Sequence, residues 1–463
     1  MDCASQSGTV ILKIGGGILR DKDSFERVVS IVEGKKKSGK KQIIVISALY
    51  GVTDSLLDSM KKCFHNSAKV EETIASLKKM HKDYLKYLSN PKIRQSAEFA
   101  LDEEISVLEK FLYGISYLKE ISPRSKDLIQ SFGERLSPIV LEAFLLDKGI
   151  NAEFMDAEEV GIFCKGPFEN AIVELEKTKK SLEKKAMPQL KDKVILLPGY
   201  YGVDEAGDVK TFGRGGTDYS AGFIANIFNA ELEVWKDVSG FMTADPKVVP
   251  AARQIETLSY DEAAELVYLG AKILHPKTID PLRQKGLCAE IKNVFAPEVR
   301  GTIICGEKKM HECVVKSIAT TKDIVLITVN SMSMINMPGF ASTLFLKLAE
   351  RDISIDLIVT SETSITFSVD NKSVEGAMDA AKSLSDSFPC TVSSKKDVSM
   401  LGIIGEGIQE TSGIAGRLFS ALGKEKINVE LIAQGSSAIN LSFVVKKADL
   451  DRALQTTHKE FIE

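Results

Sequence analysis

Short apolar runs alternate with a helical pattern at the start of the chain. The run Val10–Ile14 is broken only by Lys13, the stretch Asp23–Glu33 has the spacing of an amphipathic helix, and a second apolar run follows at Gln42–Ser47. Strand, helix and strand in this order predict an α/β layer architecture. Further strands are expected at Val194–Leu197 and Glu231–Trp235.

The stretch 55–130 has a different pattern. Apolar residues recur there at helical spacing, and charged residues fill the other faces. This predicts a helical insertion of two or three helices at about 58–128. After it, a helix is expected to open at Ser131–Arg135 and run through Leu146, and Glu256–Leu269 is expected to be helical.

The C-terminal part contains an internal repeat. Residues 324–370 overlay residues 398–444 at a shift of 74, which places Gly339 on Gly413 and Phe345 on Phe419. Each copy has the βαββαβ order of a ferredoxin-like unit. Two copies are too few for a solenoid, so a paired small-molecule-binding module is favoured.

Composition indicates an ordinary globular chain of two to four domains, with 463 residues, 44% apolar and 27% charged. A net charge of −4 argues against nucleic-acid binding. No run reaches the roughly 18 apolar residues that span a membrane, and no secretory signal is apparent. Seven scattered cysteines without a CxxC spacing favour reduced thiols over a disulfide framework or a zinc site. We expect a cytoplasmic protein.

The stretch Thr211–Ser220 contains many residues of the kinds that form binding sites. It contains three glycines, Arg214, Asp218 and hydroxyl side chains, and an apolar run follows it directly. Glycine lets the backbone approach a ligand, amides at a helix start bind anions, and arginine grips a carboxylate or phosphate with two donors. We interpret the stretch as an anion-handling loop.

Lys13 precedes a glycine triplet at Gly15–Gly17. It can be a lysine that reaches solvent at a sheet edge, but the adjacent glycines favour a phosphate-facing lysine. The glycines do not form GxGxxG, and the lysine precedes them, so neither a Rossmann site nor a P-loop is supported.

Other polar residues have two interpretations. Glu134 can be a first-turn glutamate favoured by a helix dipole or a binding residue. Asp237 can be a turn residue or a group at the carboxyl edge of the sheet, where ligands bind. The same alternatives stay open for Ser47, Thr53 and Lys272, and a structural role is favoured for His275.

Taken together, these segments resemble the aspartate kinases, within the amino acid kinase superfamily. The resemblance covers nearly the whole chain and involves six motifs in the family's order: Lys13–Gly16, Ser47–Leu57, Ser131–Ser137, Thr211–Ala221, Trp235–Lys247 and Gly270–Pro276. Ile14 and Thr217 replace the commoner phenylalanine and serine. The resemblance implies an α/β fold: a three-layer α/β/α amino acid kinase domain with a helical insertion, plus two ferredoxin-like (βαββαβ) ACT domains.

The resemblance also implies boundaries and partners. The catalytic domain is expected at 1–308, the first ACT domain at 309–392 and the second at 393–463, with strands interleaved between the two. The expected assembly is a homodimer through the ACT domains, or a tetramer, with no nucleic acid and no membrane as partner.

The implied reaction is phosphorylation of the L-aspartate β-carboxylate by ATP with Mg²⁺, giving 4-phospho-L-aspartate, the first step of aspartate-family amino acid biosynthesis. A carboxylate has a reference pKa of about 4, so the nucleophile needs no general base. The barrier is to bring two anions together, which requires cations and backbone amides. Mg²⁺ is expected to arrive through ATP, with its protein ligands left open.

The resemblance assigns roles residue by residue. Lys13 and Asp218 are the catalytic residues. The expected aspartate contacts are Ser47, Thr53, Glu134, Arg214 and Thr217. The expected ATP and phosphate contacts are Lys13, Gly15, Gly16, Gly215, Gly216, Lys236, Asp237, Met242, Lys247 and Lys272.

The first repeat is similar to the effector site of lysine-sensitive members, which implies feedback binding of L-lysine. The residues that carry this similarity are Met334, Gly339, Phe340, Ser354, Ile355, Asp356, Thr360, Ser361 and Glu362. Asp356 and Glu362 can also be ordinary loop acids. Two rival functions stay open: a glutamate or acetylglutamate kinase, and a non-catalytic amino-acid sensor.

Overall fold

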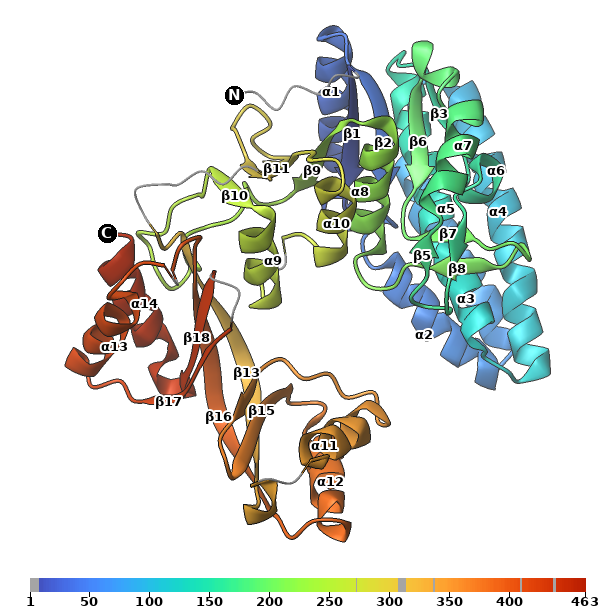
Figure 1. The fold of residues 1–463 in the computed structure, drawn as a ribbon. Coiled ribbons are helices and arrows are strands. Elements are labelled where there is room, and N and C mark those ends of the chain that lie inside the picture. Colours follow the sequence, from blue (N-terminus) through green and yellow to red (C-terminus); the bar gives the residue numbers. More distant parts are fainter. Residues whose placement is uncertain (1–7, 272, 307–313, 336–337, 409, 436–438) are drawn as a thin grey trace. The chain divides into compact units, whose positions relative to one another are not determined.

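A computed structural model describes residues 8–271, 273–306, 314–335, 338–408, 410–435 and 439–463. The chain divides into two compact units (Figure 1). Unit 1 comprises Met1–Phe241, Glu256–Tyr260 and Lys272–Glu307, and unit 2 comprises Met242–Ile255, Asp261–Ala271 and Lys308–Glu463.

Unit 1 is built on an eight-stranded sheet of order β10-β12-β11-β9-β1-β2-β6-β3. Its neighbouring strands run parallel except for β11 and β12, which are antiparallel. The strands are β1 (Thr9–Ile14), β2 (Lys41–Ile46), β3 (Ala152–Phe154), β6 (Val194–Pro198), β9 (Glu231–Lys236), β10 (Thr257–Ser259), β11 (Ala289–Asn293) and β12 (Thr302–Cys305). Two small hairpins pair β4 (Cys164–Lys165) with β5 (Ile172–Val173), and β7 (Tyr201–Val203) with β8 (Val209–Thr211).

Helices cover both faces of this sheet. Because side chains alternate along a strand, Leu12 and Ile14 of β1 pack into a core with α1 (Lys22–Lys37), and Lys13 points to the side of α8 (Gly216–Phe228). The prediction of a three-layer α/β/α architecture is therefore confirmed. Apart from the helical insertion and α5, unit 1 also contains η1 (Gly16–Ile18), α6 (Ala157–Val160), α7 (Leu175–Lys185), η2 (Gln189–Lys191), η3 (Pro276–Thr278) and α10 (Ile279–Arg283).

The helical insertion contains α2 (Val52–His65), α3 (Ala68–Leu85) and α4 (Pro91–Leu118), followed by α5 (Pro123–Asp147). The prediction that a helix opens at Ser131 is wrong, because α5 begins at Pro123. Ser122 caps that helix in a capping box with Ser125. Glu134 consequently lies in the middle of a helix, which removes its interpretation as a first-turn residue.

The stretch Glu256–Leu269 also differs from its prediction. It forms the short strand β10 and then α9 (Tyr260–Tyr268), rather than one helix. Ser259 ends the strand, and Tyr260 begins the helix directly after it. Pairing of β10 with β12 keeps the first residues of this stretch extended.

Unit 2 is built on a six-stranded antiparallel sheet of order β14-β15-β13-β16-β18-β17. Its strands are β13 (Ser317–Asn330), β14 (Ile358–Thr360), β15 (Ser364–Asp370), β16 (Thr391–Ile404), β17 (Val429–Gln434) and β18 (Asn440–Lys446). Its helices are η4 (Met332–Met334), α11 (Phe340–Ala349), α12 (Val374–Lys382), η5 (Ser383–Asp386), α13 (Ile414–Lys424), η6 (Lys447–Asp449) and α14 (Leu450–Phe461).

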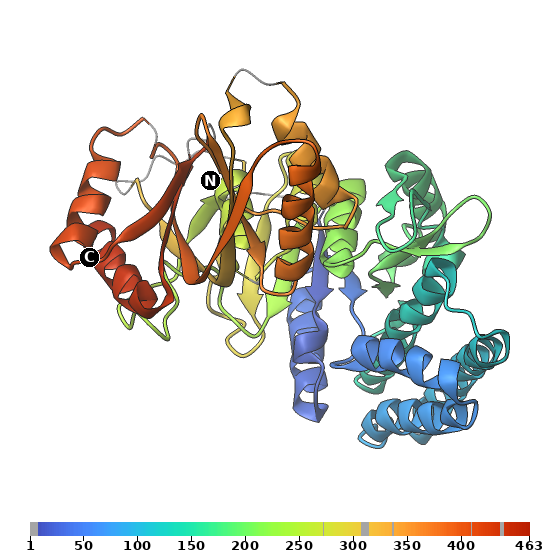
Figure 2. The ribbon, with the colours of Figure 1, turned by 90° about the horizontal axis from the view of Figure 1, so that it is seen from below.

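The two copies of the repeat share their central strands. Ser317 pairs with Ile404 and Asn330 with Thr391, and these two pairs exchange under the 74-residue shift. The second half of β13 therefore belongs to copy 1, and its first half completes the sheet of copy 2. Each copy has its own helices and core, α11 with α12 and α13 with α14 (Figures 1 and 2).

Two expectations drawn from composition can be compared with the structure. Within the described residues, no helix is long and apolar enough to cross a membrane. Cys63, Cys164, Cys305 and Cys390 are free thiols, whereas Cys288 is disulfide-bonded. The expectation of reduced thiols is thus wrong for Cys288.

Candidate active site

Lys13 lies at the carboxyl end of β1, with only 7% of its side chain exposed. Its Nζ is 2.6 Å from Oδ1 of Asp218, in the first turn of α8. A second lysine, Lys236 at the end of β9, places its Nζ 4.0 Å from the other oxygen, Oδ2. Two cations therefore flank one buried carboxylate, and the cluster carries a net positive charge.

The charges of this cluster affect one another. Burial would raise the pKa of Asp218, but Lys13 and Lys236 beside it lower that pKa below its ordinary value. Burial, with Lys13 nearby, lowers the pKa of Lys236, although Asp218 offsets part of the effect. A buried cation that one carboxylate only partly compensates gains from an added anion.

Glycines bring backbone amides to both partners of the Lys13–Asp218 pair. A Cβ on Gly16 would lie 2.3 Å from the carbonyl oxygen of Ala48, so only glycine fits there. Gly215 caps α8 with φ of +75°, which glycine adopts without strain. The amides of Gly15 and Gly16 lie near Lys13, and those of Gly215 and Gly216 open α8, where anions are favoured.

Glu134 is buried among polar side chains, close enough to Lys13 for that charge to affect the pKa of its carboxyl. Its Oε1 is 3.4 Å from Oγ of Ser47, which is itself 3.3 Å from Oγ1 of Thr217. Complete burial raises the pKa of Glu134 to about 8, although hydrogen bonds from Ala48 and Ser47 and the charge of Lys13 work against this. Its second oxygen, Oε2, is buried and has no hydrogen-bond partner among the described residues. Buried polar atoms are nearly always paired, so the unpaired Oε2 is an exception within this group of side chains.

Three further predicted residues lie at the edge of this region. Arg214, in the loop before α8, is exposed and makes no hydrogen bond or salt bridge with the described residues. Thr53, in the first turn of α2, places Oγ1 3.7 Å from the position that a Cβ on Gly133 would take, next to Glu134. Asp237 follows Lys236 directly and is exposed.

The remaining predicted nucleotide contacts lie elsewhere in the chain. Met242 and Lys247 belong to unit 2, and Lys247 is exposed. Lys272 lies outside the described residues. Unit 1 alone therefore assembles Lys13, Asp218, Lys236, Glu134 and the hydroxyls around it, without Met242 or Lys247.

Asp127 is a residue that the sequence did not point to. It is buried in the first turns of α5 and accepts hydrogen bonds from the amide and hydroxyl of Thr211, at 2.9 and 2.8 Å. It also accepts from the amide of Glu169, at 2.8 Å. Asp127 thus fixes the start of the loop that carries Arg214. A lone aspartate in a helical stretch gives no sequence signal for this role.

Tyr200 and His275 border the glycine loop. Tyr200 has a φ of +77°, which is uncommon for a side chain of this size, and it donates a hydrogen bond to Gln130 at 2.9 Å. The ring of His275 lies against Gly215, and a Cβ on Gly215 would lie 2.1 Å from it. Burial lowers the pKa of His275, while Asp218 works against this. Both residues limit the space around the loop.

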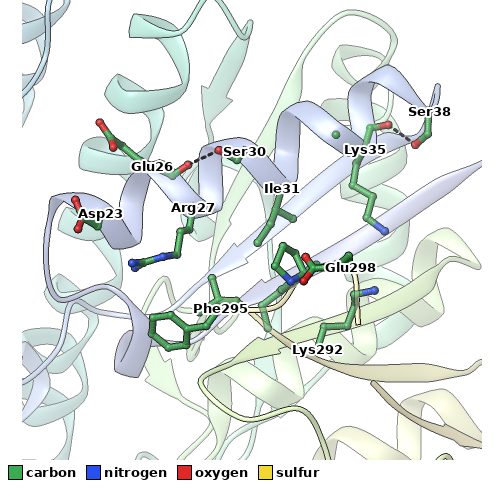
Figure 3. Close-up of a pocket in the computed structure, with 14 residues that line it drawn as sticks. Asp23, Glu26, Arg27, Ser30, Ile31, Lys35, Ser38, Lys292, Phe295 and Glu298 are labelled. Carbon is green, nitrogen blue, oxygen red and sulfur yellow. Dashed lines mark hydrogen bonds between the residues drawn. The ribbon is translucent and has the colours of Figure 1, made fainter. Parts of the chain in front are cut away.

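A pocket of about 770 Å³ lies on the other face of the sheet, between α1 and the segment after β11 (Figure 3). Arg27 lies 4.9 Å from the ring centre of Phe295, and Nζ of Lys292 lies 5.4 Å from that of Trp235. Trp235 and Lys236 are neighbours on β9, so their side chains point to opposite faces. This pocket is separate from the Lys13 cluster.

The predicted effector residues lie in copy 1 of unit 2. Phe340 is buried in the core of this copy, where its ring contacts Phe388 at 5.1 Å between centres. Ile355 and Met334 pack against the same core. Asp356 and Glu362 are exposed, and burial of part of the Asp356 carboxyl raises its pKa. The remaining predicted residues are Gly339, Ser354, Thr360 and Ser361, and Gly339 caps α11.

Two protein-family models match the chain. The model described as the amino acid kinase family matches residues 8–293, and an ACT domain model matches residues 327–384 and 401–461. The first match covers unit 1 up to β11. The second falls on the two copies of the repeat.

Similar proteins are found among curated sequences and solved structures. The chain is 31% identical to Aspartokinase 1, chloroplastic, of Arabidopsis thaliana over 98% of this chain and 80% of that protein. It is 26% identical to E. coli aspartokinase III in complex with aspartate and ADP (R-state), with a TM-score of 0.80 over 98% of this chain and 100% of that one. The same protein with lysine and aspartate (T-state) gives a TM-score of 0.83 at 26% identity over 99% and 100%. The chain belongs to the amino acid kinase family, and within it to the aspartokinases.

Proposed function

We propose that this enzyme transfers the γ-phosphoryl group of ATP to the β-carboxylate of L-aspartate, giving 4-phospho-L-aspartate. One observation carries the proposal: a buried carboxylate with an unpaired oxygen, Glu134, lies beside the positively charged cluster of Lys13, Asp218 and Lys236. The ammonium group of an amino acid needs a carboxylate partner, and a transferring phosphoryl group needs nearby positive charge.

The buried carboxyl group of Glu134 suits the ammonium group of an amino acid. An ammonium donates three hydrogen bonds, and Oε2 of Glu134 lacks a donor. The hydroxyl of Ser47 donates to Glu134, and the hydroxyl of Thr217 donates to Ser47. Arg214 makes no salt bridge with the described residues and matches the α-carboxylate through its planar fork. The acceptor carboxylate of the substrate then lies between Glu134 and the cluster of Lys13, Asp218 and Lys236.

The cluster suits the phosphoryl group. The acceptor carboxylate is already ionised at neutral pH, so catalysis rests on positioning and on stabilising charge. Lys13 is held by Asp218 at 2.6 Å, so its ammonium is oriented before ATP arrives. Removal of one such preorganised donor from a phosphoryl or oxyanion site typically costs about 10²–10³ in turnover. Asp218 is therefore the residue that orients the lysine.

A divalent metal fits this site as a partner of the nucleotide. Within the described ranges, no three His, Cys, Asp or Glu side chains gather into a metal site. Mg²⁺ is commonly bound by one or two carboxylates together with substrate phosphates, and it neutralises phosphate charge. Asp237, exposed at the end of β9, is the carboxylate at the nucleotide side that would hold it.

We further propose that L-lysine binds copy 1 of unit 2 and inhibits the enzyme, which acts at the first step of aspartate-family amino acid biosynthesis. Support comes from the residues Met334–Glu362 that resemble lysine-sensitive aspartate kinases, and from the structure of E. coli aspartokinase III with lysine and aspartate. Paired ACT copies whose sheet ends in two edge strands, β14 and β17, favour a homodimer through unit 2.

A hydroxylamine trap tests the function. The purified enzyme with ATP and Mg²⁺ is supplied in turn with aspartate, glutamate and acetylglutamate, and the acyl phosphate is measured as its hydroxamate. We expect product with aspartate only. Product with glutamate or acetylglutamate instead would assign a different amino acid kinase, and no turnover with any acid would favour the sensor. Glu134→Gln is the matched variant, because it keeps shape and removes the ammonium's counter-charge.

A further inference from the structure

Arg214 lies at the tip of a tight turn at the start of α8. Gly213 and Gly215 on either side of it have φ of +73° and +75°, in the left-handed region that glycine adopts without strain. The amide of Gly216 donates to the carbonyl oxygen of Gly213 at 2.9 Å and closes the turn. The backbone of Arg214 is thus fixed on both sides, while its exposed side chain makes no salt bridge with the described residues.

Neighbouring segments of unit 1 pack closely against both glycines of this turn. A Cβ on Gly213 would lie 2.5 Å from the carbonyl oxygen of Glu169. A Cβ on Gly215 would lie 2.1 Å from the ring of His275. The position of the turn therefore depends on the segment that contains Glu169 and on the segment that contains His275.

One buried carboxylate ties the Glu169 segment to the start of the loop. Oδ2 of Asp127 accepts from the amides of Glu169 and Thr211, at 2.8 and 2.9 Å, and Oδ1 accepts from the hydroxyl of Thr211 at 2.8 Å. Asp127 and Thr211 are both fully buried. The amide of Ala171 also donates to the carbonyl oxygen of Thr211, at 2.9 Å. Helix α5, the Glu169 segment and the Arg214 loop are thus joined at Asp127.

These three donors require a group that only accepts. An ionised carboxylate has two acceptor oxygens and no donor, and hydrogen bonds to it are stronger than those between neutral groups. Burial raises the pKa of Asp127, while the donors from Glu169 and Thr211 work against this. Glu169 has a φ of +64°, which is uncommon for a residue with a side chain. The bond from its amide to Asp127 helps to hold this conformation.

The helix that carries Asp127 also carries Glu134. The two residues are seven positions apart on α5, which is two turns or about 10 Å along the axis, so they share one face. Between them on α5, Gln130 accepts from the hydroxyl of Tyr200 at 2.9 Å. One helix therefore carries both the proposed partner of the substrate ammonium group and the anchor of the loop with Arg214.

We propose that Asp127 is a positioning residue for the amino acid substrate: through Thr211 it holds the Arg214 turn in the position, relative to Glu134, that binds aspartate. The inference rests on the proposed function, since it assumes that Arg214 and Glu134 bind the α-carboxylate and the ammonium group. Without the carboxylate of Asp127 the turn samples other positions, and the binding position becomes a fraction of the ensemble. Apparent affinity for aspartate falls by that fraction.

Turnover at saturating aspartate should be retained when Asp127 is replaced. The ion pair between Lys13 and Asp218 joins β1 to α8 and includes no residue of the turn. The charge that stabilises the phosphoryl group therefore stays in place once aspartate is bound. A positioning role thus predicts a change in KM for aspartate without a matching change in kcat.

Substitutions on both sides of the contact test this with a matched control. Asp127→Asn keeps the shape and replaces one acceptor oxygen by a donor, and Thr211→Val keeps the shape and removes the hydroxyl. Thr178→Val is the control, because Thr178 is also fully buried and its hydroxyl bonds to the backbone of Phe163, outside the Arg214 loop. We expect Asp127→Asn and Thr211→Val each to raise KM for aspartate about tenfold, as for one lost buried hydrogen bond, with kcat within about threefold. Thr178→Val should change both constants by less than about twofold.

A double-mutant cycle shows whether Asp127 acts through Arg214. When the arginine side chain is absent, Asp127 has nothing to position. Asp127→Asn should therefore lower kcat/KM for aspartate about tenfold in the native background, and less than about twofold in the Arg214→Ala background. If Asp127→Asn does not fold, Thr211→Val completes the same cycle.

The outcomes separate the inference from the function on which it rests. Equal losses of kcat/KM in the two backgrounds, or an unchanged aspartate KM in the folded single variant, would overturn the positioning role alone. Equal shifts in Thr211→Val and Thr178→Val would overturn it as well. An Arg214→Ala enzyme with unchanged aspartate KM, or a wild-type enzyme that does not phosphorylate aspartate, would instead overturn the proposed function and the inference with it.

Discussion

Lys13 and Asp218 form a buried ion pair of 2.6 Å that joins the end of β1 to the first turn of α8. Neither side chain has more than 10% of its surface exposed. With Lys236 4.0 Å from the second carboxylate oxygen, the pair is the centre of a cluster with one excess positive charge. The effect on turnover that we predict for replacement of Lys13 depends on this excess charge.

Replacement of Lys13 by alanine should lower kcat about 10²–10³-fold and change KM for aspartate by only a few-fold, because the charge matters most when phosphoryl charge develops. Steady-state kinetics with both substrates varied measures this. Lys35→Ala is the control, since Lys35 pairs with the buried Glu233 on the other face of the sheet. An unchanged turnover number in Lys13→Ala would remove Lys13 from the mechanism.

Replacement of Glu134 by glutamine should stabilise the free enzyme in a pH-dependent way. Burial raises the pKa of Glu134 from 4.5 to about 8, so the folded state keeps a proton that the unfolded state loses between these values. The contribution of Glu134 to the free energy of unfolding is fully present below pH 4.5. It falls by roughly 3–5 kcal/mol as the pH rises to about 8. Glu134→Gln should therefore exceed wild type by this amount at pH 8, and by about 1 kcal/mol or less at pH 5.

Denaturant unfolding across pH 5–8 measures this difference, with exposed Glu120→Gln as the control. The same Glu134→Gln variant should lose most of its affinity for aspartate. A wild-type stability that is flat over this range relative to the glutamine variant would mean that Glu134 is ionised in the free enzyme.

Replacement of Arg214 by alanine should raise KM for aspartate about 30- to 1,000-fold, which corresponds to about 2–4 kcal/mol for one lost bidentate charge pair. The folded state should not suffer, because Arg214 is exposed and makes no salt bridge with the described residues. Thermal unfolding and kinetics are compared with exposed Arg124→Ala, whose partner is Asp208. An aspartate KM within twofold of wild type would contradict the proposed substrate orientation.

Replacement of Glu362 by alanine should raise the lysine concentration for half-inhibition about tenfold or more, with kcat unchanged, because an acid is the natural partner of the lysine side-chain ammonium. Glu375, an exposed acid in the first turn of α12, provides the control variant. Inhibition curves with lysine and threonine measure the effect. A wild-type enzyme indifferent to lysine would contradict the effector assignment.

Much of unit 1 could be predicted from the sequence, because its polar residues follow apolar runs. The resemblance assigned Lys13 and Lys236 to one nucleotide site, and the structure places both at the carboxyl ends of neighbouring parallel strands, β1 and β9. Glu134 was identified through its motif, although its place inside α5 was not. The signal for the true start of that helix was present, since Ser122 and Pro123 form a cap and a first helical position.

The strand pairing of unit 2 and the packing of its segment Met242–Ile255 were harder to predict from the sequence. The sharing of β13 and β16 between copies depends on pairings between residues far apart in sequence, such as Ser317 with Ile404. The repeat alone is equally compatible with two independent sheets. The segment Met242–Ile255 packs in unit 2 through contacts such as the one between Thr243 and His458, 3.0 Å apart, and a single histidine in α14 gives no sign in the sequence of its partner.

The first half of β13, which completes the sheet of copy 2, is synthesised before copy 1. The other strands of copy 2 are synthesised after copy 1. During synthesis from the N-terminus, Ser317–Thr321 must therefore remain without a strand partner until β16 emerges. Thr243 must wait longer still, until the ribosome has added His458. A chain interrupted before β16 would thus carry the whole Lys13 cluster and still lack the shared strands at the centre of unit 2.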